Sequence, residues 1–238
     1  MKPTELLVLA GGFGTRLRAV VADVPKPLAP VATRPYLYYL IQAWVAQGVR
    51  SFTFLLHYQA EMIESFLDTL DGENWFEGCT VRALREPEPL GTGGAIAYAV
   101  RIFGIKQSFV VANADTWLGG GFDAISSVPA PAIAIVEVPD CSRYGSVEVS
   151  DGRVFAFREK SSMPIDGWIN AGLYHLSPAL FEQWQGQAMS LESEILPDLV
   201  RSGALRSVAL KTTFIDIGIP DDYFRFCRWI ESEKIGVL

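Results

Sequence analysis

A glycine-rich stretch at residues 9–17, LAGGFGTRL, combines residue types that bind phosphate. Gly11, Gly12 and Gly14 allow a tight turn that brings backbone N–H groups close to an anion. Arg16 adds a planar guanidinium whose donors match phosphate oxygens. The stretch lacks the third glycine of a dinucleotide-binding fingerprint, and the chain contains no G-x-x-x-x-G-K-[ST] loop. The glycines alone fit a plain strand-to-helix turn equally well, so a phosphate site needs a second element.

The segment VPKPL at residues 24–28 is a candidate for that second element. The prolines on both sides of Lys26 restrict the backbone to a stiff, extended conformation. Lys26 follows Arg16 by about ten residues. The two cations together could therefore clamp a polyphosphate.

Apolar runs of strand length alternate with amphipathic stretches of helix length in the first half of the chain. The pattern predicts strands at 6–10, 52–56, 80–84 and 108–112, and helices at 36–47, 61–70 and 94–103. Such repeated βαβ units favour a mostly parallel sheet with helices on both faces. After residue 130 we expect strands at 132–138, 146–149, 153–158 and 168–176, then helices at 178–184, 193–202 and about 220–233. This β-rich part is expected to be an insertion that faces the first half.

The composition limits the partners that the protein can bind. The 238 residues include 27 acidic and 20 basic side chains, for a net charge of −7. This charge repels a nucleic-acid backbone, so an anionic small substrate would need a local basic pocket. Three scattered cysteines and two histidines predict neither a disulfide framework nor a zinc site. No apolar run reaches the roughly 18 residues of a membrane span, and the N-terminus resembles a strand more than a signal peptide. We expect a cytoplasmic protein that binds neither nucleic acid nor membrane; its oligomeric state stays open.

Taken together, G-G-x-G-T-R-L at 11–17 and P-K-P-L at 25–28 resemble the signature of the sugar-1-phosphate nucleotidylyltransferases. Further motifs of that family follow in order at residues 88–94, 113–115, 159–160, 170–174 and 214–218. The resemblance implies a Rossmann-like (GT-A-like) α/β fold. Its mixed, mostly parallel sheet would carry helices on both faces and a β-rich sugar-binding insertion. The implied organisation is one nucleotidyltransferase domain over 1–238: a nucleotide-binding half to about 130, a sugar-phosphate-binding half to about 218, and a C-terminal helix over 219–238.

Enzymes of this family join a sugar 1-phosphate to a nucleoside triphosphate with Mg²⁺ and release pyrophosphate. The resemblance assigns catalysis to Arg16, Lys26 and Asp115, and Mg²⁺ binding to Asp115 and Asp216. It places the nucleotide on Ala10, Gly11, Gly12, Gly14, Thr15, Arg16, Lys26, Glu86, Gly91 and Thr92. It places the sugar phosphate on Gly145, Glu159, Lys160, Asn170 and Gly172. Both aspartates follow predicted strands, where open α/β sheets bind ligands. A helix cap at Asp115 and a surface turn at Asp216 are the alternatives.

The base and the sugar are suggested by shorter motifs. Glu86 stands five residues before Gly91, the spacing at which the family places a base-reading side chain. A carboxylate can accept hydrogen bonds from both N1–H and N2–H₂ of guanine, so Glu86 favours GTP, with Glu88 as the rival acceptor. Residues 23–30, 88–95 and 214–223 resemble the D-glycero-α-D-manno-heptose 1-phosphate guanylyltransferases. Mannose-1-phosphate guanylyltransferases and N-acetylmuramate 1-phosphate uridylyltransferases share much of this pattern and are alternatives.

Two other classes of protein compete with this interpretation. A GT-A glycosyltransferase would carry an Asp-x-Asp metal motif, whereas residues 113–115 read Asn-Ala-Asp. A regulatory protein that binds nucleotide sugars without catalysis would not need the full set of cationic and acidic residues named above. Trp117 is either a packing residue or part of the sugar pocket, and His57 is expected to be a core or turn residue.

Overall fold

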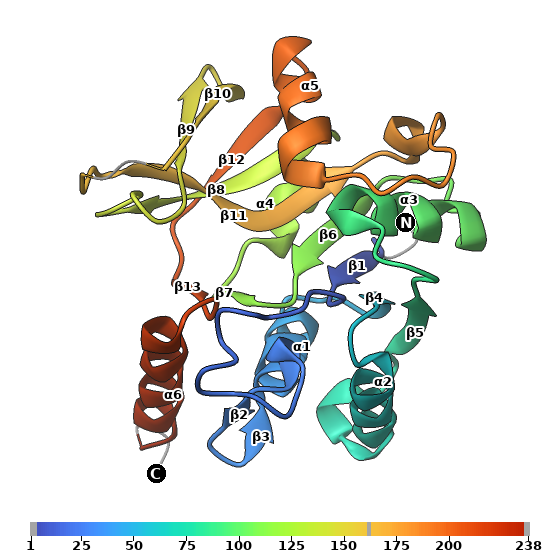
Figure 1. Ribbon diagram of the computed structural model, residues 1–238, viewed down its shortest axis with the longest axis vertical. Helices are drawn as coiled ribbons and strands as arrows, with labels where there is room; N and C mark the ends of the chain where they lie inside the picture. Colours follow the sequence, from blue (N-terminus) through green and yellow to red (C-terminus); the bar gives the residue numbers. More distant parts are fainter. Residues whose placement is uncertain (1–3, 161–162, 236–238) are drawn as a thin grey trace.

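The computed structural model describes residues 4–160 and 163–235, which fold around one nine-stranded sheet (Figure 1). One half of the sheet is entirely parallel. It contains, from the edge inward, β5 (Thr80–Arg85), β4 (Ser51–Leu56), β1 (Leu6–Leu9) and β6 (Phe109–Asn113). These are the four strands that the apolar runs of the first half predict, and the pairing confirms the expected βαβ arrangement.

The other half of the sheet is mixed. Beyond β6 it continues with β11 (Gly167–Leu176), β8 (Ala132–Val138), β12 (Arg206–Leu210), β10 (Arg153–Arg158) and β9 (Ser146–Ser150). Strand β11 is antiparallel to β6 and to β8, whereas β12 runs parallel to β8. The β-rich part therefore extends the same twisted sheet (Figure 1) instead of facing it as a separate insertion. Strand β12 has no counterpart among the predicted elements.

Helices cover both faces of the sheet, as expected. One face is packed by α1 (Tyr36–Ala46), α2 (Ala60–Asp68), α4 (Phe122–Ser127) and α6 (Pro220–Ile235), and the other by α3 (Gly91–Phe103) and α5 (Leu196–Arg201). Strand β1 shows how one apolar run serves both layers. Leu6 and Val8 pack in the first core and Leu7 in the second, because successive side chains of a strand point to opposite faces.

Short elements complete the chain. Two small antiparallel sheets pair β7 (Thr116–Leu118) with β13 (Phe214–Asp216) and β2 (Pro30–Val31) with β3 (Arg34–Pro35). Single turns of helix lie at Lys26–Leu28, Thr69–Gly72, Asn74–Phe76, Pro178–Phe181 and Leu191–Ile195. The helix expected at 178–184 is therefore reduced to the turn Pro178–Phe181, whereas the one expected at 193–202 corresponds to the turn Leu191–Ile195 continued by α5. Among the described helices, none combines the length and the apolar character needed to cross a bilayer.

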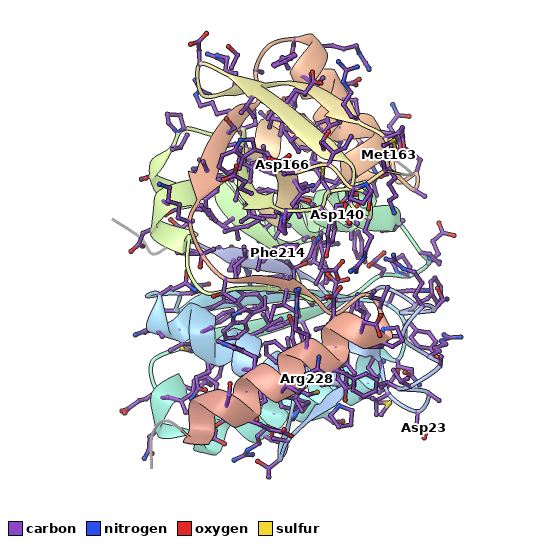
Figure 2. The ribbon with its side chains drawn as sticks, turned by 90° about the vertical axis from the view of Figure 1, so that its left-hand side faces the viewer. Asp23, Asp140, Met163, Asp166, Phe214 and Arg228 are labelled. Carbon is purple, nitrogen blue, oxygen red and sulfur yellow. The ribbon has the colours of Figure 1, made fainter. Side chains whose placement is uncertain are left out.

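The pairing of β7 with β13 joins the two halves of the molecule. It sets Asp216 opposite Thr116, the neighbour of Asp115. Figure 2 shows Phe214 between the part that carries α6, marked by Arg228, and the part that carries Asp140 and Asp166. The ring of Phe214 meets that of Tyr144 edge-on at 5.6 Å between centroids. Strand β13 thus ends at the junction of the two halves.

Candidate active site

The phosphate-binding motifs line one pocket at the carboxyl end of β1. Gly12, Gly14, Thr15 and Arg16 form one side, and Lys26, Asp115 and Gly218 complete it together with Ala10. The segment after β1 turns sharply, with the N–H of Leu17 donating to the carbonyl of Gly14 at 3.0 Å. Cationic side chains and backbone N–H groups therefore meet in one concave site, as a polyphosphate requires.

Lys26 and Asp115, which line this pocket, form a charged cluster with the neighbouring Asp216. The ammonium Nζ lies 2.6 Å from Oδ2 of Asp115 and 3.7 Å from Oδ1 of Asp216. Oδ1 of Asp216 also accepts a hydrogen bond from the N–H of Gly218 at 2.7 Å. Burial and the neighbouring Asp115 carboxylate raise the pKa of Asp216, against the opposing effect of Lys26. One cation thus faces two carboxylates, and the cluster can accept further positive charge.

The donor chemistry of this cluster fits a magnesium ion. Both carboxylates offer hard oxygen atoms. Asp115 and Asp216, about a hundred positions apart in the sequence, both lie next to the ammonium group of Lys26. Within the described part of the chain, no group of three or more acidic, histidine or cysteine side chains is arranged to hold a metal. Magnesium commonly completes its coordination with phosphate oxygens and water, so two carboxylates beside a phosphate pocket suffice.

A second pocket of about 290 Å³ adjoins the first and shares Leu9, Gly12 and Asp115 with it. Its lining includes Glu86, which was predicted to read the base, whereas Glu88 is not part of the lining. Oε2 of Glu86 accepts a hydrogen bond from the N–H of Leu90 at 2.9 Å. Burial raises the pKa of Glu86, opposed by this hydrogen bond and by the nearby His57. The carboxyl group of Glu86 therefore lines this pocket with one oxygen, Oε2, already hydrogen-bonded to the backbone.

Gly11 is required in this pocket for steric reasons. A Cβ atom at this position would lie 2.9 Å from Oε1 of Glu86 and 3.1 Å from the backbone nitrogen of His57. Any side chain here would displace the carboxylate or close the space beside it. The first glycine of the motif thus keeps the Glu86 carboxylate accessible.

Four of the five residues assigned to the sugar phosphate line a third pocket, in the β-rich half. They are Gly145, Glu159, Lys160 and Asn170, which are joined there by Arg158, Glu192 and Arg201. The fifth, Gly172, lies beneath it in an irregular part of β11 and donates its N–H to Oδ1 of Asn170 at 2.9 Å. Nδ2 of Asn170 in turn donates to the hydroxyl of Tyr174 at 2.9 Å. Gly172 therefore helps to orient Asn170.

Comparison with known proteins identifies the family. A family model described as "Nucleotidyl transferase" matches residues 5–233. The chain belongs to the nucleotidyl transferase family. It is 36% identical over 225 residues to a D-glycero-α-D-manno-heptose 1-phosphate guanylyltransferase of Aneurinibacillus thermoaerophilus, covering 92% of this chain and 95% of the relative. It is 33% identical over 239 residues to a mannose-1-phosphate guanylyltransferase catalytic subunit beta of Danio rerio, covering 97% of this chain and 66% of the relative.

A solved structure agrees with the fold of this nucleotidyl transferase. HddC from Yersinia pseudotuberculosis, complexed with GMP-PN, superposes with a TM-score of 0.82 at 35% identity. The match covers 95% of this chain and 99% of that chain. These findings confirm the resemblance drawn from the sequence motifs, together with the Rossmann-like α/β fold that it implies.

The sequence interpretation missed two residues that line the second pocket of this family member. His57 follows β4 and lines the pocket next to Glu86, although it was expected to be a core or turn residue. Phe13, the variable position of the glycine motif, lines the pocket too and meets the His57 ring edge-on at 5.9 Å between centroids. The available signal was the position of His57 directly after a parallel strand, where ligands bind.

Trp117 belongs to the core of the nucleotidyl transferase and not to the sugar pocket. Its side chain is only 8% exposed and packs against Phe226 and Trp229 of α6, at 5.3 and 5.0 Å between ring centroids. Of the two alternatives open from the sequence, packing is correct. The contact holds α6 against the small sheet that carries Asp216.

Gly91, which the motif places near the base, lines the second pocket and also packs closely against protein. Its φ is +71°, and a Cβ atom there would lie 2.7 Å from the carbonyl oxygen of Met189. We expect Gly91→Ala to destabilise the fold by at least about 1 kcal/mol more than Gly78→Ala. Gly78 has a similar φ of +76° but open space around it, so its variant isolates the backbone effect. Urea unfolding of both variants measures the difference, and equal losses would contradict the packing role of Gly91.

Proposed function

We propose that the protein transfers the nucleotidyl group of GTP to D-glycero-α-D-manno-heptose 1-phosphate, releasing pyrophosphate and forming a GDP-heptose. The observation that carries the proposal is the cluster formed by Lys26, Asp115 and Asp216. Lys26 and Asp115 line a phosphate pocket that adjoins a base pocket containing Glu86, and Asp216 lies 3.7 Å from Lys26. The relatives named above, which carry this activity or the corresponding activity on mannose 1-phosphate, support the choice of substrates. Nucleoside triphosphates are cytoplasmic metabolites, so we place the reaction in the cytoplasm.

The reaction needs positioned positive charge more than acid–base chemistry. A phosphate oxygen of the sugar substrate is already ionised and attacks the α-phosphorus in line, with pyrophosphate leaving. Arg16 and Lys26 hold the triphosphate, and Lys160, in the third pocket, holds the sugar phosphate. Asp115 and Asp216 would hold Mg²⁺, which supplies positive charge to the phosphate oxygens when bound. The protein's own contribution is to hold the two substrates in the orientation that in-line attack requires.

Glu86 is proposed to select guanine through its ionised form. A carboxylate accepts from the N–H groups on the guanine edge, whereas a protonated carboxyl presents a competing O–H. We therefore expect kcat/KM for GTP to fall on acidification. Because burial raises the pKa of Glu86, the fall should begin at a higher pH than for an exposed glutamate. In Glu86→Gln, which cannot ionise, that part of the pH profile should disappear.

ITP provides the control for this prediction, because it lacks the N2 amino group of guanine. Wild type should prefer GTP over ITP, and Glu86→Gln should reduce that preference. Loss of one hydrogen bond to a charged acceptor is worth about 1.5–3 kcal/mol, or roughly tenfold and more in kcat/KM. Equal use of GTP and ITP by wild type would reject guanine selection by Glu86.

A matrix of substrates tests the proposed function as a whole. The four common nucleoside triphosphates are each combined with heptose, mannose and N-acetylmuramate 1-phosphates, and pyrophosphate release is measured with Mg²⁺. The proposal expects the GTP and heptose pair to give the highest kcat/KM. A higher value with mannose 1-phosphate, or with UTP and N-acetylmuramate 1-phosphate, would replace the proposed substrates by those pairs.

A further inference from the structure

The glycine-rich loop at the start of α3 is bound to a segment of the other half of the molecule. The N–H groups of Gly93 and Gly94 both donate to the carbonyl of Met189, at 2.9 and 3.0 Å. The N–H of Met189 donates in return to the carbonyl of Leu90 at 2.8 Å. These hydrogen bonds, together with the close contact at Gly91, fix the loop to the segment that leads into the helical turn Leu191–Ile195.

Thr92 extends this contact with its side chain. Its hydroxyl donates to Oε2 of Glu192 at 2.6 Å and accepts a hydrogen bond from the N–H of Leu191 at 2.8 Å. A threonine hydroxyl has one proton, and here Glu192 receives it. Thr92, which was assigned to the nucleotide, lines the second pocket together with Glu86, while its hydroxyl bonds to residues of the sugar-binding half.

Glu192 lies where the loop meets the sugar pocket. It lines the third pocket together with Asn170 and Lys160. Its charge also contributes, after burial, to the raised pKa of Tyr174, the residue that receives the hydrogen bond from Asn170. The carboxylate therefore stands close to the residues that were assigned to the sugar phosphate.

The chemistry of Glu192 suits a sugar. Within the described residues, the hydrogen bonds that reach this carboxylate come from Thr92 and Ser190, and both end on Oε2. Oε1 can therefore accept from a ligand. An ionised carboxylate is purely an acceptor and matches the O–H donors of a pyranose ring, whereas it repels the phosphate group.

We propose that Glu192 binds hydroxyl groups of the sugar 1-phosphate and that Thr92 is the positioning residue that holds it in place. The inference rests on the proposed function, in which a sugar 1-phosphate is the second substrate. A loop that begins beside the base pocket thus orients a side chain of the sugar pocket. Contact between the two substrate sites runs through the hydrogen bond between Thr92 and Glu192.

The test combines steady-state kinetics with direct nucleotide binding. Glu192→Gln and Thr92→Val should each raise KM for the preferred sugar 1-phosphate by about tenfold or more. In Glu192→Gln, which leaves the second pocket intact, binding of GTP alone, measured by calorimetry, should remain as in wild type. Thr92→Ser keeps the hydroxyl and should restore a KM close to that of wild type. The double variant should be no worse than Glu192→Gln alone, because both changes act on one carboxylate.

Glu182→Gln serves as the matched control, since it removes an exposed carboxylate from the same half outside the pocket. An unchanged sugar KM in Glu192→Gln would overturn the proposal. Weaker GTP binding with an unchanged sugar KM in Thr92→Val would return Thr92 to the nucleotide site. A wild-type enzyme that neither binds nor turns over any sugar 1-phosphate would reject the proposed function and, with it, this inference.

Discussion

Asp115→Asn is expected to lower kcat by about a hundredfold or more, and Asp216→Asn to have an effect of similar size. Each change removes one of the two negative charges that lie beside Lys26. In the wild-type protein Nζ of Lys26 lies 2.6 Å from Oδ2 of Asp115 and 3.7 Å from Oδ1 of Asp216. A bound metal ion stabilises the transition state by several kcal/mol. Loss of that stabilisation lowers the rate by about a hundredfold or more. The measurement is pyrophosphate release at saturating substrates over a range of Mg²⁺ concentrations.

Asp123→Asn is a suitable control, because this aspartate is exposed at the start of α4 and away from the three pockets described above. Addition of EDTA should abolish the activity of wild type and of the control alike. An aspartate whose asparagine variant keeps the wild-type kcat at saturating Mg²⁺ would have no role in metal binding. A variant that recovers only at higher Mg²⁺ would have lost affinity while retaining the chemistry.

Lys26→Met is expected to lower kcat/KM for the nucleoside triphosphate by about a hundredfold. The substitution keeps most of the apolar stem, whose side chain is only 9% exposed, but removes the ammonium that separates two carboxylates. The pair with Asp115 is only partly buried, and a hydrogen bond to a charged group is worth about 1.5–3 kcal/mol, or roughly ten- to a hundredfold in kcat/KM. The repulsion between Asp115 and Asp216 would then favour protonation of Asp216, whose pKa is already raised.

Lys106→Met provides the comparison for Lys26, since Lys106 is exposed after α3. The two variants should differ in nucleotide binding measured without sugar phosphate, and not in folding measured by circular dichroism. Equal kcat/KM values for both would show that Lys26 only stabilises the protein and does not contact the phosphates.

Much of the fold could be predicted because its central strands are buried on both faces. The runs LLVL of β1 and FVVAN of β6 are continuous apolar stretches of strand length, which predict buried strands. Strand β12 lacks that signal. Its sequence RSVAL is mostly half-buried, and its place between β8 and β10 depends on residues far away in the chain. Local hydrophobicity predicts a strand but not its neighbours.

The candidate site shows the same division between local and distant information. The glycine motif and Lys26 are close in sequence, so their shared pocket could be predicted from spacing. The convergence of Asp115 and Asp216 depends on the pairing of β7 with β13, which motif resemblance implies but spacing does not. Gly91 and Thr92, which the motif places near the base, line the second pocket, and they also contact Met189, Leu191 and Glu192. Sequence alone gives no reason to expect a contact with residues about a hundred positions away.

The place of β12 in the sheet has a consequence for the order in which the chain can fold. Synthesis releases the N-terminal residues first, so β1, β4, β5 and β6 leave the ribosome long before residue 206. These four strands are mutual neighbours and need no later strand to pair. In contrast, β8 and β10 share β12 as their common neighbour, and among the described strands the β9–β10 hairpin is paired to the rest of the sheet through β12. Asp216 emerges later still, on β13. A nascent chain can thus complete the parallel half of its sheet during translation, whereas Asp115 and Asp216 cannot meet until nearly all of the described chain has been made.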